Sequence, residues 1–287
     1  MIAAAGFLLL QSAAACAGGV VVEIIDGRKA KADITLPNPN GGSYTAEFEI
    51  EFEQEGLENL TVECLGLTAD VLDASEIASV ESRLPHGSEV PPPGTQTQFV
   101  DPAFPVRVTV EPPVSCGLAF EDNYEVSLDT DDLVFVASSK YRLVKAPLGG
   151  AFVYVTGAVT AGSVRARGRA GGFSEFVMIR DDAPQYSNDC KNEYDVLEAR
   201  VAQSPMSPTA RRTLEIDIAR SRAAYEAGNF QTAIDLLAPF DQHCVEYGGE
   251  GLPNRWRSQR DLDNVEGALV GHTDNLRFMM GRLNGSP

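Results

Sequence analysis

Three arginines alternate along one predicted strand, and they are Arg165, Arg167 and Arg169. Residues two apart on a strand lie on the same face, and a guanidinium group offers a fork of donors that fits a carboxylate or a sulfate. One interpretation is therefore a binding face for a protein or a glycan. The favoured interpretation is pairing with an acidic stripe on a neighbouring strand, worth about 0.2 to 1 kcal/mol per pair. That stripe consists of Glu47, Glu49, Glu51 and Glu53.

Paired carboxylates are the one catalytic device that the composition leaves open. The chain has 41 acidic residues, and glycoside cleavage needs only two carboxylates at a suitable separation. A carbohydrate-active or other hydrolase acting through the predicted β region is thus the alternative function. The sequence lacks the nucleophile-elbow, zinc-protease, phosphate-loop and dinucleotide-binding motifs. We therefore predict no catalytic residue and favour a noncatalytic binding protein.

The densest acidic cluster of the predicted β region could bind Ca²⁺ through carboxylate oxygens. It comprises Asp129, Asp131 and Asp132, with Glu121 and Asp122 nearby. The cluster lacks the ligand spacing and the glycine of an EF-hand loop, so a solvated turn is favoured. With three histidines and no Cys-x-x-Cys pair, a zinc site is not predicted either. No cofactor is expected, and Ca²⁺ is the weak alternative.

The charge balance limits the class of partner. The chain carries 23 basic and 41 acidic residues, a formal net charge of −18 and a pI near 4.5. Nucleic acids and anionic membrane surfaces attract clustered Lys and Arg, which such a chain does not supply. The expected partner is an unknown protein or a glycan, and nucleic acid is not expected.

The first 17 residues resemble a secretory signal. Residues 2–15 are apolar or small apart from Gln11 and Ser12, and they end in Ala13-Ala14-Ala15-Cys16. The alternative is that this segment continues a buried strand over residues 20–25. No stretch reaches the roughly 20 apolar residues of a transmembrane helix, so no membrane span is expected. The prediction is export to the periplasm, the outer membrane or the outside, with Cys16 either lipidated as an anchor or removed by cleavage.

Four cysteines remain beyond the signal-like segment, and they are Cys64, Cys116, Cys190 and Cys244. An even number in an oxidising compartment indicates disulfides, with three pairings available. The simplest pairing is within each part of the chain, Cys64 with Cys116 and Cys190 with Cys244. In an up-and-down bundle the second pair would lie at opposite ends, whereas bridged Cα atoms lie within about 7 Å.

Residues 18–182 read as a β-rich domain of antiparallel, sandwich-like form. Asp26-Gly27 favours a tight hairpin turn between residues 20–25 and 32–36. Residues 47–53 alternate strictly between apolar and acidic, as a half-buried strand does. Similar patterns cover residues 60–72, 106–110, 133–136, 152–156 and 173–179. A short helix is expected over residues 74–84, followed by an extended proline-rich loop over residues 85–94.

Residues 189–287 show helical periodicity and predict a small all-α bundle of about four helices. They are expected over residues 194–202, 208–227, 230–245 and from 258 to 283. Ser207-Pro208 is a start signal for the second helix, and Ser258 with Asp261 is spaced like a capping box for the fourth. The fold class is therefore α+β in two parts.

Two stretches carry resemblances to known families. Residues 224–230 (AYEAGNF), with Ala233-Ile234 and Leu236-Leu237 after them, are similar to a tetratricopeptide turn, but no 34-residue period repeats. The better resemblance is to the FIMAH-type helical module of secreted bacterial proteins, and it covers about residues 189–283. The body resembles an uncharacterised family of exported proteobacterial proteins over residues 141–143, 145–150, 162–165 and 171–176. These resemblances imply export and a two-part architecture, and they imply no catalytic residue.

Overall fold

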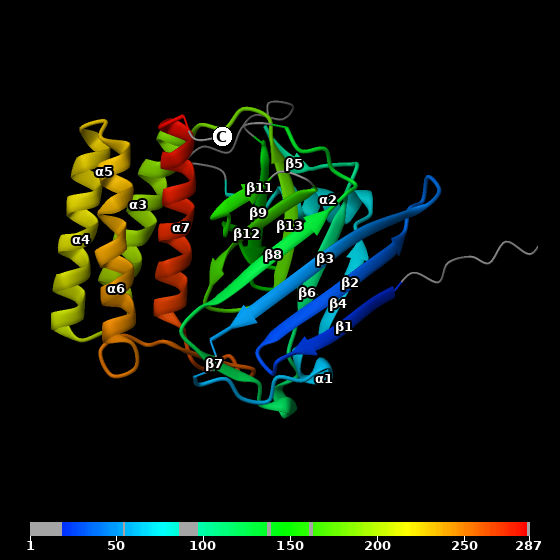
Figure 1. The fold of residues 1–287 in the computed structure, drawn as a ribbon, viewed down its shortest axis with the longest axis horizontal. Helices are drawn as coiled ribbons and strands as arrows, with labels where there is room; N and C mark the ends of the chain where they lie inside the picture. Colours follow the sequence, from blue (N-terminus) through cyan, green and yellow to red (C-terminus); the bar gives the residue numbers. More distant parts are fainter. Residues whose placement is uncertain (1–18, 54, 86–96, 137–138, 161–162, 286–287) are drawn as a thin grey trace, which may run out of the picture.

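The computed structural model describes residues 19–53, 55–85, 97–136, 139–160 and 163–285. Strands fill most of the chain up to residue 181, and helices fill most of it from residue 186. The class is α+β, as the sequence predicts. Figure 1 shows the helices gathered at one side of the sheets. The signal-like residues, Cys16 and most of the proline-rich loop lie outside the described residues.

The first sheet is six-stranded and antiparallel, in the order β1-β2-β3-β8-β12-β11. Its strands are β1 (Gly19–Ile25), β2 (Lys29–Pro37), β3 (Ser43–Phe52), β8 (Tyr124–Thr130), β12 (Val164–Ala170) and β11 (Ala158–Thr160). The predicted hairpin joins β1 and β2, with positive φ angles at Asp26 and Gly27. The connection is three residues long, and Asp-Gly supplies the positive φ angles of its tight turn, so the predicted hairpin is confirmed.

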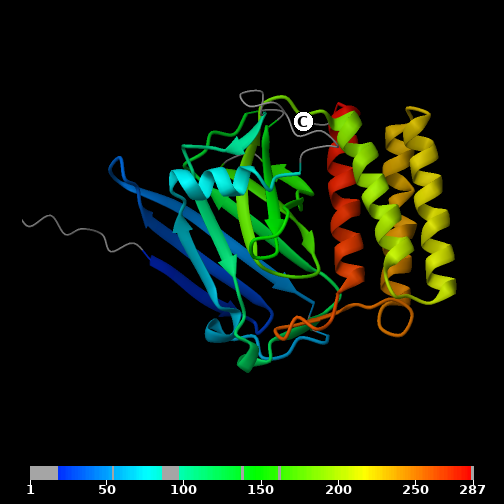
Figure 2. The same cartoon turned by 180° about the vertical axis from the view of Figure 1, so that it is seen from behind.

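The second sheet has the order β10-β9-β13-β6-β4, and β5 also pairs with β13. Its strands are β4 (Leu67–Val71), β5 (Gln98–Val100), β6 (Val106–Val110), β9 (Tyr141–Ala146), β10 (Val153–Tyr154) and β13 (Glu175–Asp181). Inner faces of the two sheets pack together, for example through Phe48 and Phe176, whose ring centroids are 5.2 Å apart. Helix α2 (Ala74–Glu81) covers the opposite face of the second sheet, in cyan in Figure 2.

The helical part, here called the bundle, contains α3 (Tyr186–Gln203), α4 (Pro208–Glu226), α5 (Phe230–Asp235), α6 (Leu237–Tyr247) and α7 (Val265–Leu283). Ser207 accepts a hydrogen bond from the amide of Ala210, so the predicted cap of α4 is confirmed. The predicted third helix is divided at Leu236 into α5 and α6. None of the helices among the described residues is long and apolar enough to cross a bilayer.

Helix α7 connects the bundle to the first sheet, because it packs directly on β12 (Figure 1). A Cβ atom on Gly267 would lie 2.5 Å from the Cα of Gly171, and one on Gly271 would lie 2.7 Å from the carbonyl oxygen of Arg169. Both glycines are therefore needed for this close backbone approach. A second connection is β14 (Arg255–Arg257), which pairs with β7 (Ala119–Glu121).

Three predicted elements are corrected by the structure. Residues 133–136 form no strand, and the strand lies just before them as β8. Residues 62–65 form a short helix, α1 (Val62–Leu65), ahead of β4 instead of one continuous strand. The last helix does not begin at Ser258, because residues 255–257 pair with β7. Asn264 caps α7 instead, accepting a hydrogen bond from the amide of Gly267.

One of the two predicted disulfides is present. Cys64 and Cys116 are bonded, with Cα atoms 5.3 Å apart, and they join α1 to a 3-10 turn, η1 (Val114–Cys116). Cys190 and Cys244 are free and buried, so the second pairing is wrong. Cys190 lies near the start of α3 and Cys244 near the end of α6. The chain between them reverses direction twice, which places the two thiols at opposite ends of the bundle (Figure 1).

Candidate functional site

The predicted arginine stripe lies on the outer face of β12, but its neighbour is β8 and not the acidic strand β3. The outward-facing residues form three rows across β12, β8 and β3. These rows are Arg165-Asp129-Glu47, Arg167-Ser127-Glu49 and Arg169-Glu125-Glu51. The predicted pairing with the glutamates therefore fails for two of the three arginines, since β8 separates the strands. Each arginine has a different environment.

Arg165 is neutralised within the sheet. Its Nε and Nη2 atoms lie 2.7 and 2.5 Å from Oδ2 of Asp129, and Glu47 is 3.9 Å away. The hydrogen bond with Asp129 raises the pKa of Arg165. Arg165 is thus the member of the stripe that behaves as the pairing interpretation predicts.

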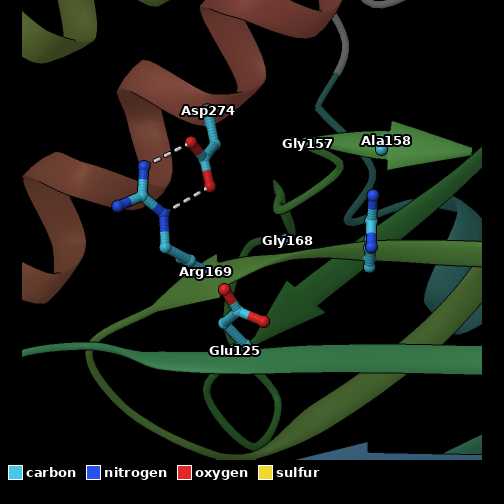
Figure 3. Close-up of a pocket in the computed structure, with 7 residues that line it drawn as sticks. Glu125, Gly157, Ala158, Gly168, Arg169 and Asp274 are labelled. Atoms are coloured by element: carbon cyan, nitrogen blue, oxygen red, sulfur yellow. Dashed lines mark hydrogen bonds and ion pairs between the residues drawn. The ribbon is translucent and has the colours of Figure 1, made fainter. Parts of the chain in front are cut away.

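Arg169 is neutralised from the bundle. Nε and Nη2 donate to the two carboxylate oxygens of Asp274 on α7, at 2.7 and 2.5 Å, and Nη2 also donates to Asp241 at 3.1 Å (Figure 3). Arg277 donates to the same two acids, at 3.3 and 2.8 Å. Burial by itself would lower the pKa of Arg169, but the bonds and charges of Asp274 and Asp241 raise it overall. This cluster is a structural contact between β12 and α7.

Arg167 is the arginine of the stripe that stays available. Its side chain is exposed, and it has no ion pair or side-chain hydrogen bond with any described residue. Opposite it on β8 is the small Ser127, which cannot neutralise a guanidinium group. The exposed carboxylate of Glu125, two residues along β8, likewise has no partner in the described parts of the chain. One cation and one anion therefore face solvent side by side on this sheet.

Two adjoining hollows open around Arg167 and Glu125, which line both. The larger, about 380 Å³, lies between β12 and α7 and is drawn in Figure 3. The smaller, about 100 Å³, extends over β8 toward β3. We call the two together the polar trough. Its lining residues are Glu49, Glu51, Glu125, Val126, Ser127, Gly157, Ala158, Arg165, Arg167, Gly168, Arg169 and Asp274.

Small residues explain why the sheet is hollowed here. Ser127 separates the long side chains of Glu49 and Arg167, so the middle row is open at its centre. At Gly168 a Cβ atom would lie 1.6 Å from the carbonyl oxygen of Val155, so only glycine lets the segment before β11 approach β12 so closely. The amide of Gly157 donates to the carbonyl of Arg167 at 2.7 Å and fixes the rim of the larger hollow.

Most of the acidic cluster considered for Ca²⁺ is used in internal contacts. Asp129 binds Arg165 and Ser163, and Asp132 accepts a hydrogen bond from the amide of Thr45 at 2.7 Å. Glu121 pairs with Arg255 at 3.0 Å. Within the described ranges, no group of three or more His, Cys, Asp or Glu side chains is arranged to hold a metal ion.

The carboxyl groups with the most strongly raised pKa values lie outside the trough. A general acid is a carboxyl group whose pKa is raised by burial or by a neighbouring charge. Two carboxyl groups have strongly raised pKa values: about 6 for Asp189 and about 9 for Glu266. Burial is the largest cause of both shifts. Neither lines the trough. What the trough offers is an exposed guanidinium group, a carboxylate and several backbone and hydroxyl groups.

Two charged residues of the trough were missed from the sequence. Glu125 could have been found, because residues 124–130 alternate as a strand with Glu125, Ser127 and Asp129 on one side. Asp274 gives no such signal, since it meets β12 only through the packing of α7, more than 100 residues further along the chain.

No curated protein matches the chain. Two solved structures, the CBM51-2 and INT domains from Clostridium perfringens ZmpB and the same protein in complex with GlcNAc, are 10% identical to it. Each match covers 79% of this chain and 55% of the other, with a TM-score of 0.17, so the chain spans about half the length of those structures. A family model described as a family of unknown function, DUF6689, matches residues 3–284. Because that match spans both the sheets and the bundle, the chain belongs to the DUF6689 family.

Proposed function

We propose that this protein is a noncatalytic binding protein of the cell envelope or the extracellular space, and that the polar trough holds its partner, a protein or a glycan. The observation that carries the proposal is the exposed pair of Arg167 and Glu125, neither of which has a partner among the described residues. Charged side chains on a sheet surface are readily paired with neighbours, as Arg165 and Arg169 are here. Leaving two of them open around a hollow favours recognition of an external group.

Export is part of this proposal. It rests on the signal-like first 17 residues, on the disulfide between Cys64 and Cys116, and on the resemblance to exported proteobacterial proteins. Disulfides persist mainly in oxidising compartments. In the same proposal the bundle is a FIMAH-like module, and Cys16 is either an acylated anchor or lost with the signal.

The alternative, a hydrolase with paired carboxylates, has one observation in its favour. Glu125 and Asp274 line the same hollow. However, both oxygens of Asp274 accept hydrogen bonds from Arg169, which leaves neither free to attack a substrate or to deliver a proton. Glycoside cleavage requires two working carboxyl groups. The binding function is therefore the better supported of the two.

A pull-down from envelope extracts tests the proposal. The immobilised wild-type protein is expected to retain a partner that the Arg167→Ala variant releases. The matched control is Arg212→Ala, because Arg212 is also exposed and without an ion pair among the described residues, but lies on α4. A partner retained equally by the wild type and by Arg167→Ala would exclude the trough as the binding face.

A further inference from the structure

We propose that the polar trough binds a small zwitterion, namely a short peptide or amino-acid derivative with one ammonium and one carboxylate. The carboxylate would contact Arg167, and the ammonium would contact Glu125. This inference rests on the proposed binding function and narrows the ligand to a peptide-like molecule, in place of a glycan.

The first argument is the balance of charge in the trough. Glu49 is paired with Lys29 at 2.8 Å and Glu51 with Arg28 at 2.5 Å. Arg165, Arg169 and Asp274 also have their partners within the protein. The charges left without a partner among the lining residues are therefore one guanidinium and one carboxylate. A ligand with one charge of each sign satisfies both.

The second argument excludes the other ligand classes. A polyanion such as a sulfated glycan would bring several negative charges to a trough in which Arg167 is the one unpaired cation among the described lining residues, on a protein of net charge −18. An apolar ligand or a stacked sugar ring would need apolar or aromatic surface. None of the lining residues is aromatic, and Val126 and Ala158 are the apolar ones.

The third argument is the spacing of the two charges. Arg167 lies opposite Ser127, so Glu125 is its diagonal neighbour, and diagonal neighbours on adjacent strands have Cα atoms about 7 to 8 Å apart. The two groups do not form an ion pair with each other. A ligand that bridges them can hold its own charges apart by about two residues of extended chain, ~7 Å, which matches the spacing of the two Cα atoms. The termini of a dipeptide provide this spacing.

Titration followed by amide NMR shifts tests the inference, with three dipeptide probes. Glycylglycine carries both charges, N-acetyl-glycylglycine carries only the carboxylate, and glycylglycine amide carries only the ammonium. We expect glycylglycine to shift amide signals around Ser127 and Gly157 at about 10 mM, the range of a weak site. Each singly charged probe should bind more weakly, by up to about fivefold, since it loses one of two exposed ion pairs.

Two charge-removing variants complete the test. Arg167→Ala should abolish the preference for glycylglycine over glycylglycine amide, and Glu125→Gln should abolish the preference over N-acetyl-glycylglycine. The controls Arg212→Ala and Glu215→Gln, at exposed positions on α4, should keep both preferences. If N-acetyl-glycylglycine binds as well as glycylglycine, or if no probe shifts the trough signals, the proposal of a zwitterionic ligand is wrong. The wider binding function is judged separately, by whether Arg167→Ala loses the partner in the pull-down.

Discussion

Glu266, in the first turn of α7, is a carboxyl group with no exposed surface. No group in the described part of the chain donates a hydrogen bond to either of its oxygens. Its neighbour is Asp122, itself held by Asn254 at 2.8 Å, and two carboxylates can bond to each other only when one is protonated. Burial, followed by the bond and the charge of Asp122, raises the pKa of Glu266 to about 9. Glu266 is thus held neutral at physiological pH, where α7 packs on the turn before β8.

We expect Glu266 to make the stability of the protein fall as the pH rises. Between pH 4.5, the ordinary pKa, and about 9, the folded protein keeps a proton that the unfolded chain has released. The free energy of unfolding therefore decreases through this window by up to roughly 1.4 kcal/mol per pH unit. Glu266→Gln keeps a donor toward Asp122 without a titrating group. It should flatten this part of the curve and stabilise the protein above neutral pH.

Denaturant unfolding at a series of pH values measures this effect. The control is Glu215→Gln, which removes the same charge from an exposed position on α4 and should leave the slope unchanged. If Glu266→Gln and the wild type have the same slope between pH 5 and pH 9, Glu266 is ionised when folded and the assignment is wrong.

Neither the burial of Glu266 nor the lack of a partner for Arg167 could be predicted from the sequence. An acid in the first turn of a helix is ordinarily a favourable surface residue, and only the packing of α7 against residues 122 and 171 buries this one. Likewise, the alternation of three arginines predicts their common face. It cannot predict that Asp129 and Asp274 neutralise two of them and leave the third.

At the scale of elements, strands with one buried face were predictable and the connections between them were not. The pattern over residues 47–53 identifies β3, and residues 106–110 identify β6. In the sheet, β8 lies between β3 and β12. The sequence did not predict this order, because the neighbours of a strand depend on long-range packing. Residues 62–65 form a helix instead of a strand, with Thr61 as its cap at 3.1 Å from the amide of Cys64.

The disulfide Cys64–Cys116 is expected to be a large stabilising constraint, since it closes a loop of 52 residues. The chain-entropy estimate for such a loop is about 4 kcal/mol. A double variant, Cys64→Ser with Cys116→Ser, should lose a comparable part of the unfolding free energy. The wild-type protein should lose a similar amount of unfolding free energy on reduction, whereas the stability of the double variant should not change with the reductant.

Cys190 and Cys244 provide the control, because burial raises the pKa of both thiols and keeps them in the unreactive form. Mass spectrometry of the mature protein should find the 64–116 link and two free thiols, and it also reports cleavage and acylation at Cys16. A link between Cys190 and Cys244 would contradict the arrangement of α3 and α6.

At the scale of the whole molecule, the sheets and the bundle share one apolar core. One cluster of buried residues contains Phe48 and Phe176 of the sheets together with Leu269 and Leu276 of α7. Trp256, on β14, packs against Phe120 with ring centroids 5.5 Å apart. The sequence predicts two parts joined by a linker, and it does not predict this shared packing, which depends on contacts between residues more than 100 positions apart. We expect the two parts to unfold in one cooperative transition.

Gly267→Ala tests this coupling with a minimal change. Replacing glycine by alanine inside a helix is ordinarily stabilising by about 0.5 to 1 kcal/mol. Here the new Cβ atom would lie 2.5 Å from the Cα of Gly171 and 2.8 Å from the carbonyl oxygen of Asp122. Backbone atoms cannot move aside as easily as the end of a side chain can. We therefore expect the free energy of unfolding to fall by about 2 kcal/mol or more. The control Ala223→Val, on the exposed face of α4, should change the stability by less than about 0.5 kcal/mol.

Two probes observe the two parts separately in this experiment. Trp256 is the single tryptophan of the chain and reports on the contact with β7, whereas far-ultraviolet circular dichroism reports mainly on the helices. In the wild type the two signals should change together, as a two-state transition requires. In Gly267→Ala both should move together to lower denaturant. A helical signal that outlasts the tryptophan signal would mean that the bundle folds alone, and α7 would then be a contact between independent domains instead of part of a common core.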